Sequence, residues 1–263
     1  MIRDISLFES FKIQVRVIGA LVMRETLTRY SRDNIGFLWL FVEPMLVTSS
    51  ISLLWIASQS HQAFKLPITA FILTGYSSLL LWRSMTARCS GAIAGNISLL
   101  YHHNVRILDL FISRIILEFV GVSISFVFLM LMFISIGWME PPVDILTVVI
   151  GWLILAWFGA SLGLVIGCLG ARYVIVEKIW KPLSYFLTPF TGLSFMVDWL
   201  PTNVRTVALY FPMVHGVEIV RVGYFGKFIH AHYDIGYACF ICLCLNCIGL
   251  LLAAQASKKV RPS

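Results

Sequence analysis

The sequence predicts an all-α integral membrane protein with six transmembrane helices, an N-terminal amphipathic interface helix, and outer re-entrant or interfacial helices between spans five and six. Of the 263 residues, 59% are hydrophobic and 13% are charged, whereas soluble chains carry about 25% charged residues. The mean hydropathy is +0.88. A soluble domain of this length cannot bury so much apolar surface, because surface-to-volume scaling limits its interior. Disorder and a disulfide-stapled miniprotein are excluded by the same values.

Residues 1–34 form the first predicted unit, a cytoplasmic amphipathic interface helix. Apolar and basic residues recur at helical spacing, as in a helix that lies on a membrane surface. The apolar positions are Phe8, Phe11, Val15, Ile18, Val22 and Met23, and the basic ones are Lys12, Arg16, Arg24 and Arg29. A plain surface anchor explains the pattern equally well. We expect no cleavable signal peptide, because charges run throughout this unit.

Residues 35–263 form the second predicted unit, a six-helix transmembrane domain. A helical span needs about 20 mostly apolar residues. Such stretches lie at roughly 35–57, 67–88, 110–137, 145–168, 179–197 and 234–256. The stretch 203–220 is not counted as a span, because each of its charges would cost about 2.5–3.5 kcal/mol at mid-bilayer.

The distribution of basic residues predicts the topology. With six spans and a cytoplasmic N-terminus, sixteen of the 20 Lys and Arg residues lie on the cytoplasmic side, which fits the positive-inside rule. A seventh span would export Lys258, Lys259 and Arg261. We therefore expect both termini in the cytoplasm and a broken pair of outer helices at about 198–225. The net charge of +7 follows from this topology, and no basic groove or aromatic platform indicates nucleic-acid binding.

Several catalytic and cofactor motifs do not occur. The chain contains no G-x-x-x-x-G-K-[ST] loop, G-x-S-x-G elbow or H-E-x-x-H pair, so we expect no catalytic residues and no nucleotide site. Four cysteines share the last predicted span, at Cys239, Cys242, Cys244 and Cys247. They wrap around more than one helix face and do not converge on one ion, so we interpret them as small apolar side chains and expect no metal site.

Glycine recurs every fourth residue in the fourth predicted span, at Gly159, Gly163 and Gly167. A ridge without side chains lets another helix approach closely. Packing within the subunit and a contact between two copies both fit the pattern.

Two groups of ionisable residues are candidates for function. Glu43 precedes Pro44 about eight residues into span one, where a carboxylate is either functional or paired structurally. His215, Glu218 and Arg221 share one helical face. This outer helix cluster fits a hydrogen-bonded structural role or a proton relay.

Three motifs carry a resemblance to a known family. They are Arg24-Glu25-x-Leu27-x-Arg29-Tyr30-x5-Gly36-x-Leu38-Trp39-x3-Glu43-Pro44, then Val105-x2-Leu108-Asp109-x-Phe111-Ile112-x-Arg114-x2-Leu117-Glu118, then Trp199-Leu200-Pro201-x3-Arg205 with Phe211-Pro212-Met213-Val214-His215-x2-Glu218-x2-Arg221-x2-Tyr224-Phe225. Together they resemble type-2 ABC-transporter permeases of the capsular polysaccharide exporter branch. One departure is Phe211, where many relatives carry Asn.

The resemblance implies a function and a set of partners. Such permeases are homodimers in the bacterial inner membrane that pair with two separate ATP-binding subunits, which bind ATP and Mg. They export lipid-linked acidic capsular polysaccharide. A periplasmic co-polymerase and an outer-membrane polysaccharide channel complete the conduit.

Within this frame we expect two sets of substrate contacts. A basic rim would attract the polyanion, through Arg24, Arg29 and Arg32. A conduit between two copies of spans one and five would be lined by Phe37, Phe41, Glu43, Tyr185, Phe186 and Phe190. Ordinary helix packing is the alternative for each aromatic residue. Lys181-Pro182 and Pro189 interrupt span five and suit a gating element.

We expect the ATP-binding subunit to dock on two cytoplasmic segments. The candidate coupling residues are Tyr101, His102, His103, Asn104, Arg106, Arg172, Glu177 and Lys178. An ordinary charged loop is the alternative for both segments.

Three competing functions remain. The first is export of another glycan, such as O-antigen or teichoic acid. The second is an integral-membrane glycan-modifying transferase, which the scattered histidines and the lack of a converging acid pair disfavour. The third is a passive channel.

Overall fold

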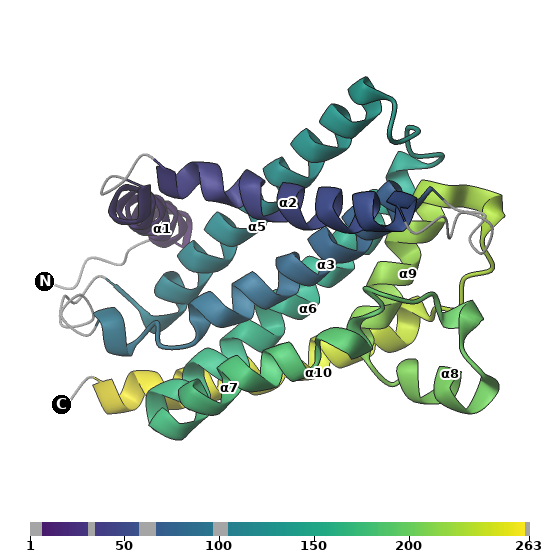
Figure 1. The fold of residues 1–263 in the computed structure, drawn as a ribbon. Helices are drawn as coiled ribbons and strands as arrows, with labels where there is room; N and C mark the ends of the chain where they lie inside the picture. Colours follow the sequence, from purple (N-terminus) through teal and green to yellow (C-terminus); the bar gives the residue numbers. More distant parts are fainter. Residues whose placement is uncertain (1–6, 31–34, 58–66, 97–104, 261–263) are drawn as a thin grey trace, which may run out of the picture.

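The computed structural model describes residues 7–30, 35–57, 67–96 and 105–260, and in this part of the chain every regular element is a helix, with no strand (Figure 1). The α-helices are α1 (Leu7–Tyr30), α2 (Ile35–Ala57), α3 (Ile68–Cys89), α5 (Ile107–Ile136), α6 (Ile145–Arg172), α7 (Val174–Phe186), α8 (Thr202–Ala208), α9 (Pro212–Phe225) and α10 (Ile235–Val260). Short 3-10 turns are η2 (Ala94–Asn96), η3 (Thr188–Thr191), η4 (Val197–Trp199) and η5 (Gly226–Phe228). The prediction of an all-α fold is confirmed.

The long helices run beside one another, and α1 crosses one end of this bundle (Figure 1). The end of α10 lies at the same end of the bundle as α1, whereas α8 and α9 lie at the opposite end. Within the described residues, three helices are long and apolar enough to cross a membrane: Ile107–Ile136, Ile145–Arg172 and Ile235–Ser257. A shorter apolar stretch, Phe41–Leu54, lies in α2.

The fifth predicted span, 179–197, is interrupted at Pro189 as predicted but not at Pro182, and its second half is not an α-helix. Helix α7 ends at Phe186 and is followed by η3, which has Pro189 in its first turn. A proline ring clashes with the preceding turn and lacks an N–H, so an α-helix cannot continue regularly through Pro189. Gly192 then takes a left-handed conformation at φ 80°, and the chain turns away. Pro182 lies inside α7 without ending it.

The glycine ridge of α6 packs within the subunit, which decides between the two predicted alternatives. A Cβ atom on Gly159 would lie 2.7 Å from Trp82 Cα of α3, and one on Gly167 would lie 2.3 Å from Phe111 Cε1 of α5. On another side of α6, a Cβ on Gly151 would lie 2.7 Å from the Val220 nitrogen of α9. Helix α6 is therefore the centre of the bundle, because its glycines let three neighbouring helices approach closely.

The start of α6 is held by a side-chain cap. The Asp144 carboxylate accepts hydrogen bonds from the Thr147 hydroxyl at 2.6 Å and from the Leu146 and Thr147 amides at 3.0 and 3.4 Å. These bonds satisfy amides that lack intrahelical partners. They also hold the pKa of Asp144 below its usual range, because they favour the ionised carboxylate, with the Thr147 hydroxyl contributing most.

Gly167→Ala should destabilise the protein by about 1–3 kcal/mol, because the added methyl overlaps the Phe111 ring in a packed core. Gly19→Ala is the matched control, since a Cβ at Gly19 meets no atom within 4 Å. Thermal unfolding of the purified proteins in detergent measures both. Equal midpoints for the two variants would contradict the packing described here.

Candidate functional site

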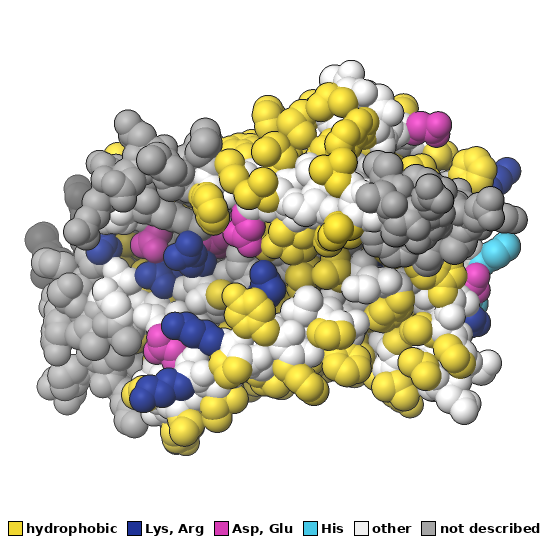
Figure 2. Space-filling view, in the orientation of Figure 1, with side chains coloured by type: hydrophobic (Ala, Val, Ile, Leu, Met, Phe, Trp, Pro, Cys, Tyr) yellow, Lys and Arg dark blue, Asp and Glu magenta, His cyan; other side chains and the backbone are white. Residues whose placement is uncertain are grey.

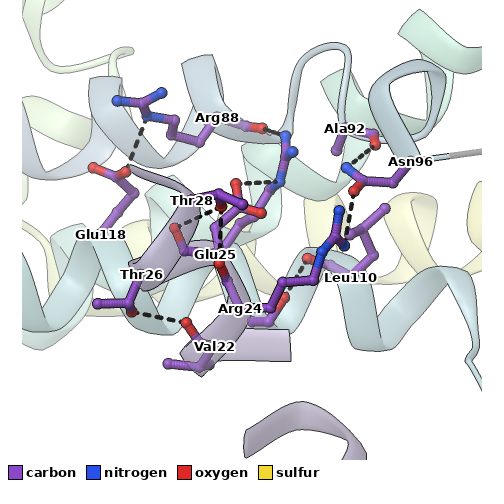
Figure 3. A network of polar contacts seen from close by, with 12 residues as sticks. Val22, Arg24, Glu25, Thr26, Thr28, Arg88, Ala92, Asn96, Leu110 and Glu118 are labelled. Atoms are coloured by element: carbon purple, nitrogen blue, oxygen red, sulfur yellow. Dashed lines mark hydrogen bonds and ion pairs between the residues drawn. The ribbon is translucent and has the colours of Figure 1, made fainter. Parts of the chain in front are cut away.

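A chain of charged side chains connects α1 to α3 and α5 (Figure 3). Arg114 of α5 pairs with Glu25 of α1, with 3.3 Å between Nε and Oε1. Its Nη1 donates to the Arg88 carbonyl at the end of α3 at 2.6 Å. The Arg88 Nε in turn donates to Glu118 of α5 at 3.1 Å, and Glu118 is 2% exposed. We call Glu25, Arg114, Arg88 and Glu118 the polar seam. Each charge in it faces an opposite charge, as a low-dielectric bundle requires.

Further polar contacts tie α1 to the turn that follows α3 and to the start of α5. Arg24 Nη1 donates to the Asn96 side-chain oxygen at 3.2 Å, and the Asn96 amide donates to the Ala92 carbonyl at 3.0 Å. The Gln14 amide donates to Asp109, which also accepts from the Arg106 backbone N–H at 2.9 Å. Helix α1 is thus docked on protein through specific bonds.

Two cavities adjoin the polar seam. The smaller, of about 230 Å³, lies between Glu25, Thr28, Arg114 and Glu118. The larger, of about 390 Å³, is lined by Glu43, Pro44, Ser77, Leu80, Arg83, Ser84, Ala87, Arg88, Glu118, Val122, Ser125 and Tyr185. Arg88 and Glu118 line both. We call the larger cavity the groove; it lies between α2, α3, α5 and α7. Figure 2 shows basic and acidic side chains gathered in a hollow with apolar side chains above and below it.

The structure brings together two of the six residues predicted to line a conduit. Glu43 and Tyr185 both face the groove. The Tyr76 hydroxyl donates to Glu43 at 3.1 Å. The Arg83 guanidinium lies 5.0 Å from the centre of the Tyr185 ring. Glu43 is therefore hydrogen-bonded within the subunit and also borders a cavity, and a functional role for it remains a prediction.

The other predicted conduit residues lie outside the groove lining. Phe41 packs edge-on against Phe128 of α5, with ring centres 5.2 Å apart. Phe186 and Phe190 contact each other at 5.9 Å, and Phe190 stacks on Phe211 at 5.6 Å. The Phe37 side chain lies outside the described residues. These aromatic residues remain predictions as conduit liners.

The predicted rim and coupling residues are only partly described. Arg32, Tyr101, His102, His103 and Asn104 lie outside the described residues, as does the side chain of Arg29. Arg106 precedes α5 and is exposed, as is Lys178 of α7. The Arg172 guanidinium lies 5.4 Å from the Tyr173 ring centre and borders a cavity of about 520 Å³ beside α10.

Glu177 of α7 lies against the turn that follows α3. A Cβ on Gly91, whose φ is 71°, would lie 2.6 Å from the Glu177 Oε1. The positive φ favours glycine there. Because Gly91 has no side chain, the Glu177 carboxylate can pack against this turn. Because Arg24 of α1 bonds Asn96, the turn 90–96 contacts both α1 and α7.

Comparisons with known proteins identify the family of this chain. A family model described as ABC-2 type transporter matches residues 16–225. The chain belongs to the ABC-2 type transporter family. The resemblance to type-2 ABC-transporter permeases, predicted from three motifs, is confirmed.

Three relatives show how much of the chain this ABC-2 likeness covers. The capsule polysaccharide export inner-membrane protein CtrC of Neisseria meningitidis serogroup B is 44% identical over 98% of this chain and 97% of its own length. The capsule polysaccharide export inner-membrane protein BexB of Haemophilus influenzae is 41% identical over 97% of this chain and 96% of its own. The polysialic acid transport protein KpsM of Escherichia coli is 26% identical, over 92% and 94% respectively.

At the other end of this ABC-2 bundle, the outer helix cluster is buried and bonded to backbone. His215, Glu218 and Arg221 are 2%, 1% and 0% exposed. The Asp234 amide donates to His215 Nδ1 at 2.9 Å, so Nδ1 is an acceptor. The other nitrogen, Nε2, therefore carries the proton of a neutral ring and donates to the Leu209 carbonyl at 2.8 Å.

Arg221 fixes the segment between η3 and η4. Its Nη1 and Nη2 donate to the Phe195 and Leu193 carbonyls at 2.6 and 3.0 Å, while its guanidinium lies 3.9 Å from the Phe71 ring centre. The Glu218 carboxylate accepts from the Val197 amide at 3.3 Å. These contacts favour the structural role weighed for the cluster, because each side chain bonds backbone groups that lie outside the α-helices.

Sequence reasoning missed the groove arginines and Glu118 as site residues. Arg83 and Arg88 were counted only among the cytoplasmic charges between or flanking spans two and three, because both lie near the end of span two. Glu118 was assigned no role beyond its place in the second of the three motifs. Its position inside an apolar span is a signal that could have found it, since a carboxylate in a membrane helix needs a partner.

The cysteines of α10 differ in their surroundings. Cys242 is buried, Cys239 and Cys244 are half-buried, and Cys247 is exposed. Among the described residues, no three His, Cys, Asp or Glu side chains come together in an arrangement that could hold a metal ion.

Glu25→Gln should loosen α1, because it leaves Arg114 without its carboxylate partner. We expect the free energy of local opening of α1 to fall by about 1 kcal/mol. The α1 amides should then exchange hydrogen severalfold faster. Arg16→Gln, at an exposed position of the same helix, should leave the exchange unchanged. Unaltered protection of α1 in Glu25→Gln would show that the seam does not dock the helix.

Arg221→Met should lower stability by about 3 kcal/mol or more, because two buried carbonyls lose charge-assisted donors. Lys227→Met, at an exposed position just beyond α9, is the control and should leave the unfolding midpoint unchanged. Thermal unfolding in detergent compares the two. A wild-type midpoint for Arg221→Met would contradict the bonding role of the cluster.

Proposed function

We propose that this chain is the membrane-spanning subunit of an ATP-driven exporter that moves lipid-linked acidic capsular polysaccharide across the bacterial inner membrane. The observation that carries the proposal is the likeness to CtrC over 98% of this chain and 97% of that protein, since that protein is named for capsule polysaccharide export. The groove adds a physical reason. Charged and hydroxyl-bearing side chains border a cavity inside an apolar bundle, which suits a path for a hydrated polymer.

We infer an arrangement of six spans with both termini in the cytoplasm. Helices α2, α3, α5, α6 and α10 would cross the membrane, and α7 with η3 would form the broken fifth span. Helices α8 and α9 would lie on the outer side. The positive-inside distribution of Lys and Arg supports this orientation. Helix α1 would lie in the cytoplasmic interface, where its polar contacts dock it on α3 and α5.

The proposed transporter is a homodimer with two separate ATP-binding subunits. The lack of a phosphate-binding loop in the sequence supports a separate subunit for ATP hydrolysis. The segment from Tyr101 to Arg106 and the segment from Arg172 to Lys178 remain the proposed docking sites. A periplasmic co-polymerase and an outer-membrane polysaccharide channel are the proposed further partners.

In this arrangement a groove from each copy would face a shared conduit. Glu43 and Tyr185 would border it, and the basic rim of Arg24, Arg29 and Arg32 would attract the acidic polymer from the cytoplasm. Arg24 keeps its bond to Asn96, so four of its five guanidinium N–H groups are left for a phosphate or carboxylate.

Deletion of the gene in its native cell tests the proposal. We expect long acidic polysaccharide to disappear from the surface and to accumulate inside, with export restored by the wild-type gene. Fractionation and surface staining measure both pools. Normal surface capsule in the deletion strain would refute capsule export, and loss of O-antigen or teichoic acid instead would reassign the substrate.

A further inference from the structure

Arg83 differs from the other arginines that line the two cavities. Arg88 donates to Glu118, and Arg114 pairs with Glu25 and donates to a carbonyl. The guanidinium of Arg83 contacts the Tyr185 ring at 5.0 Å. Among the described residues, no carboxylate oxygen lies within 4.0 Å of it and none of its N–H groups has a protein acceptor.

An acid is available in the same groove but is engaged elsewhere. The Glu43 carboxylate accepts from the Tyr76 hydroxyl at 3.1 Å and forms no ion pair with Arg83. A half-buried guanidinium with five unpaired donors beside an apolar bundle is costly unless an acceptor arrives. The arrangement thus leaves a positive charge open to the groove in a bundle whose other groove-lining charges are paired or bonded.

We propose that Arg83 and Tyr185 form a receptor for an anionic group, a carboxylate or a phosphate, in the groove. This inference rests on the proposed export function and assigns the residues that contact the acidic substrate. The planar guanidinium can bind either anion through two parallel hydrogen bonds. The Tyr185 ring, which is 66% exposed, offers an apolar face to the C–H side of a neighbouring sugar.

The size and strength of the receptor suit a moving polymer. The groove of about 390 Å³ lies within the range of about 300–1,000 Å³ that is usual for ligand sites. A single guanidinium binds an anion weakly when water is nearby. Weak binding lets a polymer with repeated acidic groups move on, as permeating ions do between successive sites.

Charge-selective labelling tests the receptor without transport. Ser84 lines the groove beside Arg83, so Ser84→Cys is labelled in the purified chain with an anionic and a cationic methanethiosulfonate reagent, in a background without native cysteines. We expect Arg83→Gln to lower the anionic-to-cationic rate ratio about fivefold, since an anion about 4 Å away loses roughly 1 kcal/mol or more. Lys227→Gln is the charge-matched control and should leave the ratio unchanged. An unchanged ratio in Arg83→Gln would overturn the proposal.

Protection experiments distinguish the two sources of the anion. Glucuronate serves as the probe for a sugar carboxylate, and glycerol phosphate as the probe for a lipid phosphate. Slower labelling of Ser84→Cys by one probe, lost in Arg83→Gln, identifies the corresponding group as the ligand. Labelling of Lys227→Cys reports nonspecific effects of the two probes. If neither probe slows the labelling of Ser84→Cys at concentrations up to those that change the labelling of Lys227→Cys, an anion site is contradicted.

Export measured in cells separates this inference from the proposed function. If deletion of the gene abolishes surface capsule, Arg83→Gln at wild-type membrane level should lower export severalfold, and Arg83→Lys should restore part of it. Wild-type export by Arg83→Gln in that strain would refute the receptor alone. Capsule that survives the deletion would instead refute the proposed function.

Discussion

The carboxylate of Glu118 is 2% exposed within a helix of strongly apolar composition, and much of the structure depends on how this charge is neutralised. Isolated ions are costly in a low-dielectric interior, whereas a paired and hydrogen-bonded ion is tolerated. Arg88 supplies the pairing from the end of α3. Arg114 bonds the Arg88 carbonyl and pairs with Glu25, so α1 becomes part of the same chain of contacts. The polar seam therefore fixes α1, and its residues Arg88 and Glu118 form part of the groove wall.

Close helix packing provides the rigid frame behind this groove. The glycines of α6 let α3, α5 and α9 approach to contact distance, so little freedom remains between these helices. At the opposite end, Arg221 binds two carbonyls of the segment between η3 and η4 and lies on Phe71 of α3. Phe71 also stacks on Trp199. Movement in a transport cycle would then concentrate in the elements that pack less against this frame, namely α2 and α7.

Hydropathy was sufficient to locate α2, α3, α5, α6 and α10, because each coincides with a stretch of mostly apolar residues. It was not sufficient for 179–197: Pro189 predicted an interruption, but hydropathy did not reveal that the α-helix ends at Phe186 and that the chain bends at Gly192. The motifs predicted the family, and Glu43 was found because a carboxylate is conspicuous in a span. Arg83 was missed because basic residues near a span end look like loop charges. Among the described residues, none accepts a hydrogen bond from the Arg83 guanidinium. Only the folded structure reveals this.

If the groove serves export, it is a water-filled path within the membrane bundle, and thiol accessibility can test this. Leu80 lines the groove, nine residues or about 13 Å from the end of α3. Ile116 is exposed on α5 and lies two residues from Glu118, which lines the same groove. In membranes from cells that express a variant without native cysteines, Leu80→Cys should react with a membrane-impermeant thiol reagent and Ile116→Cys should not. Protection of Leu80→Cys equal to that of Ile116→Cys would contradict the account.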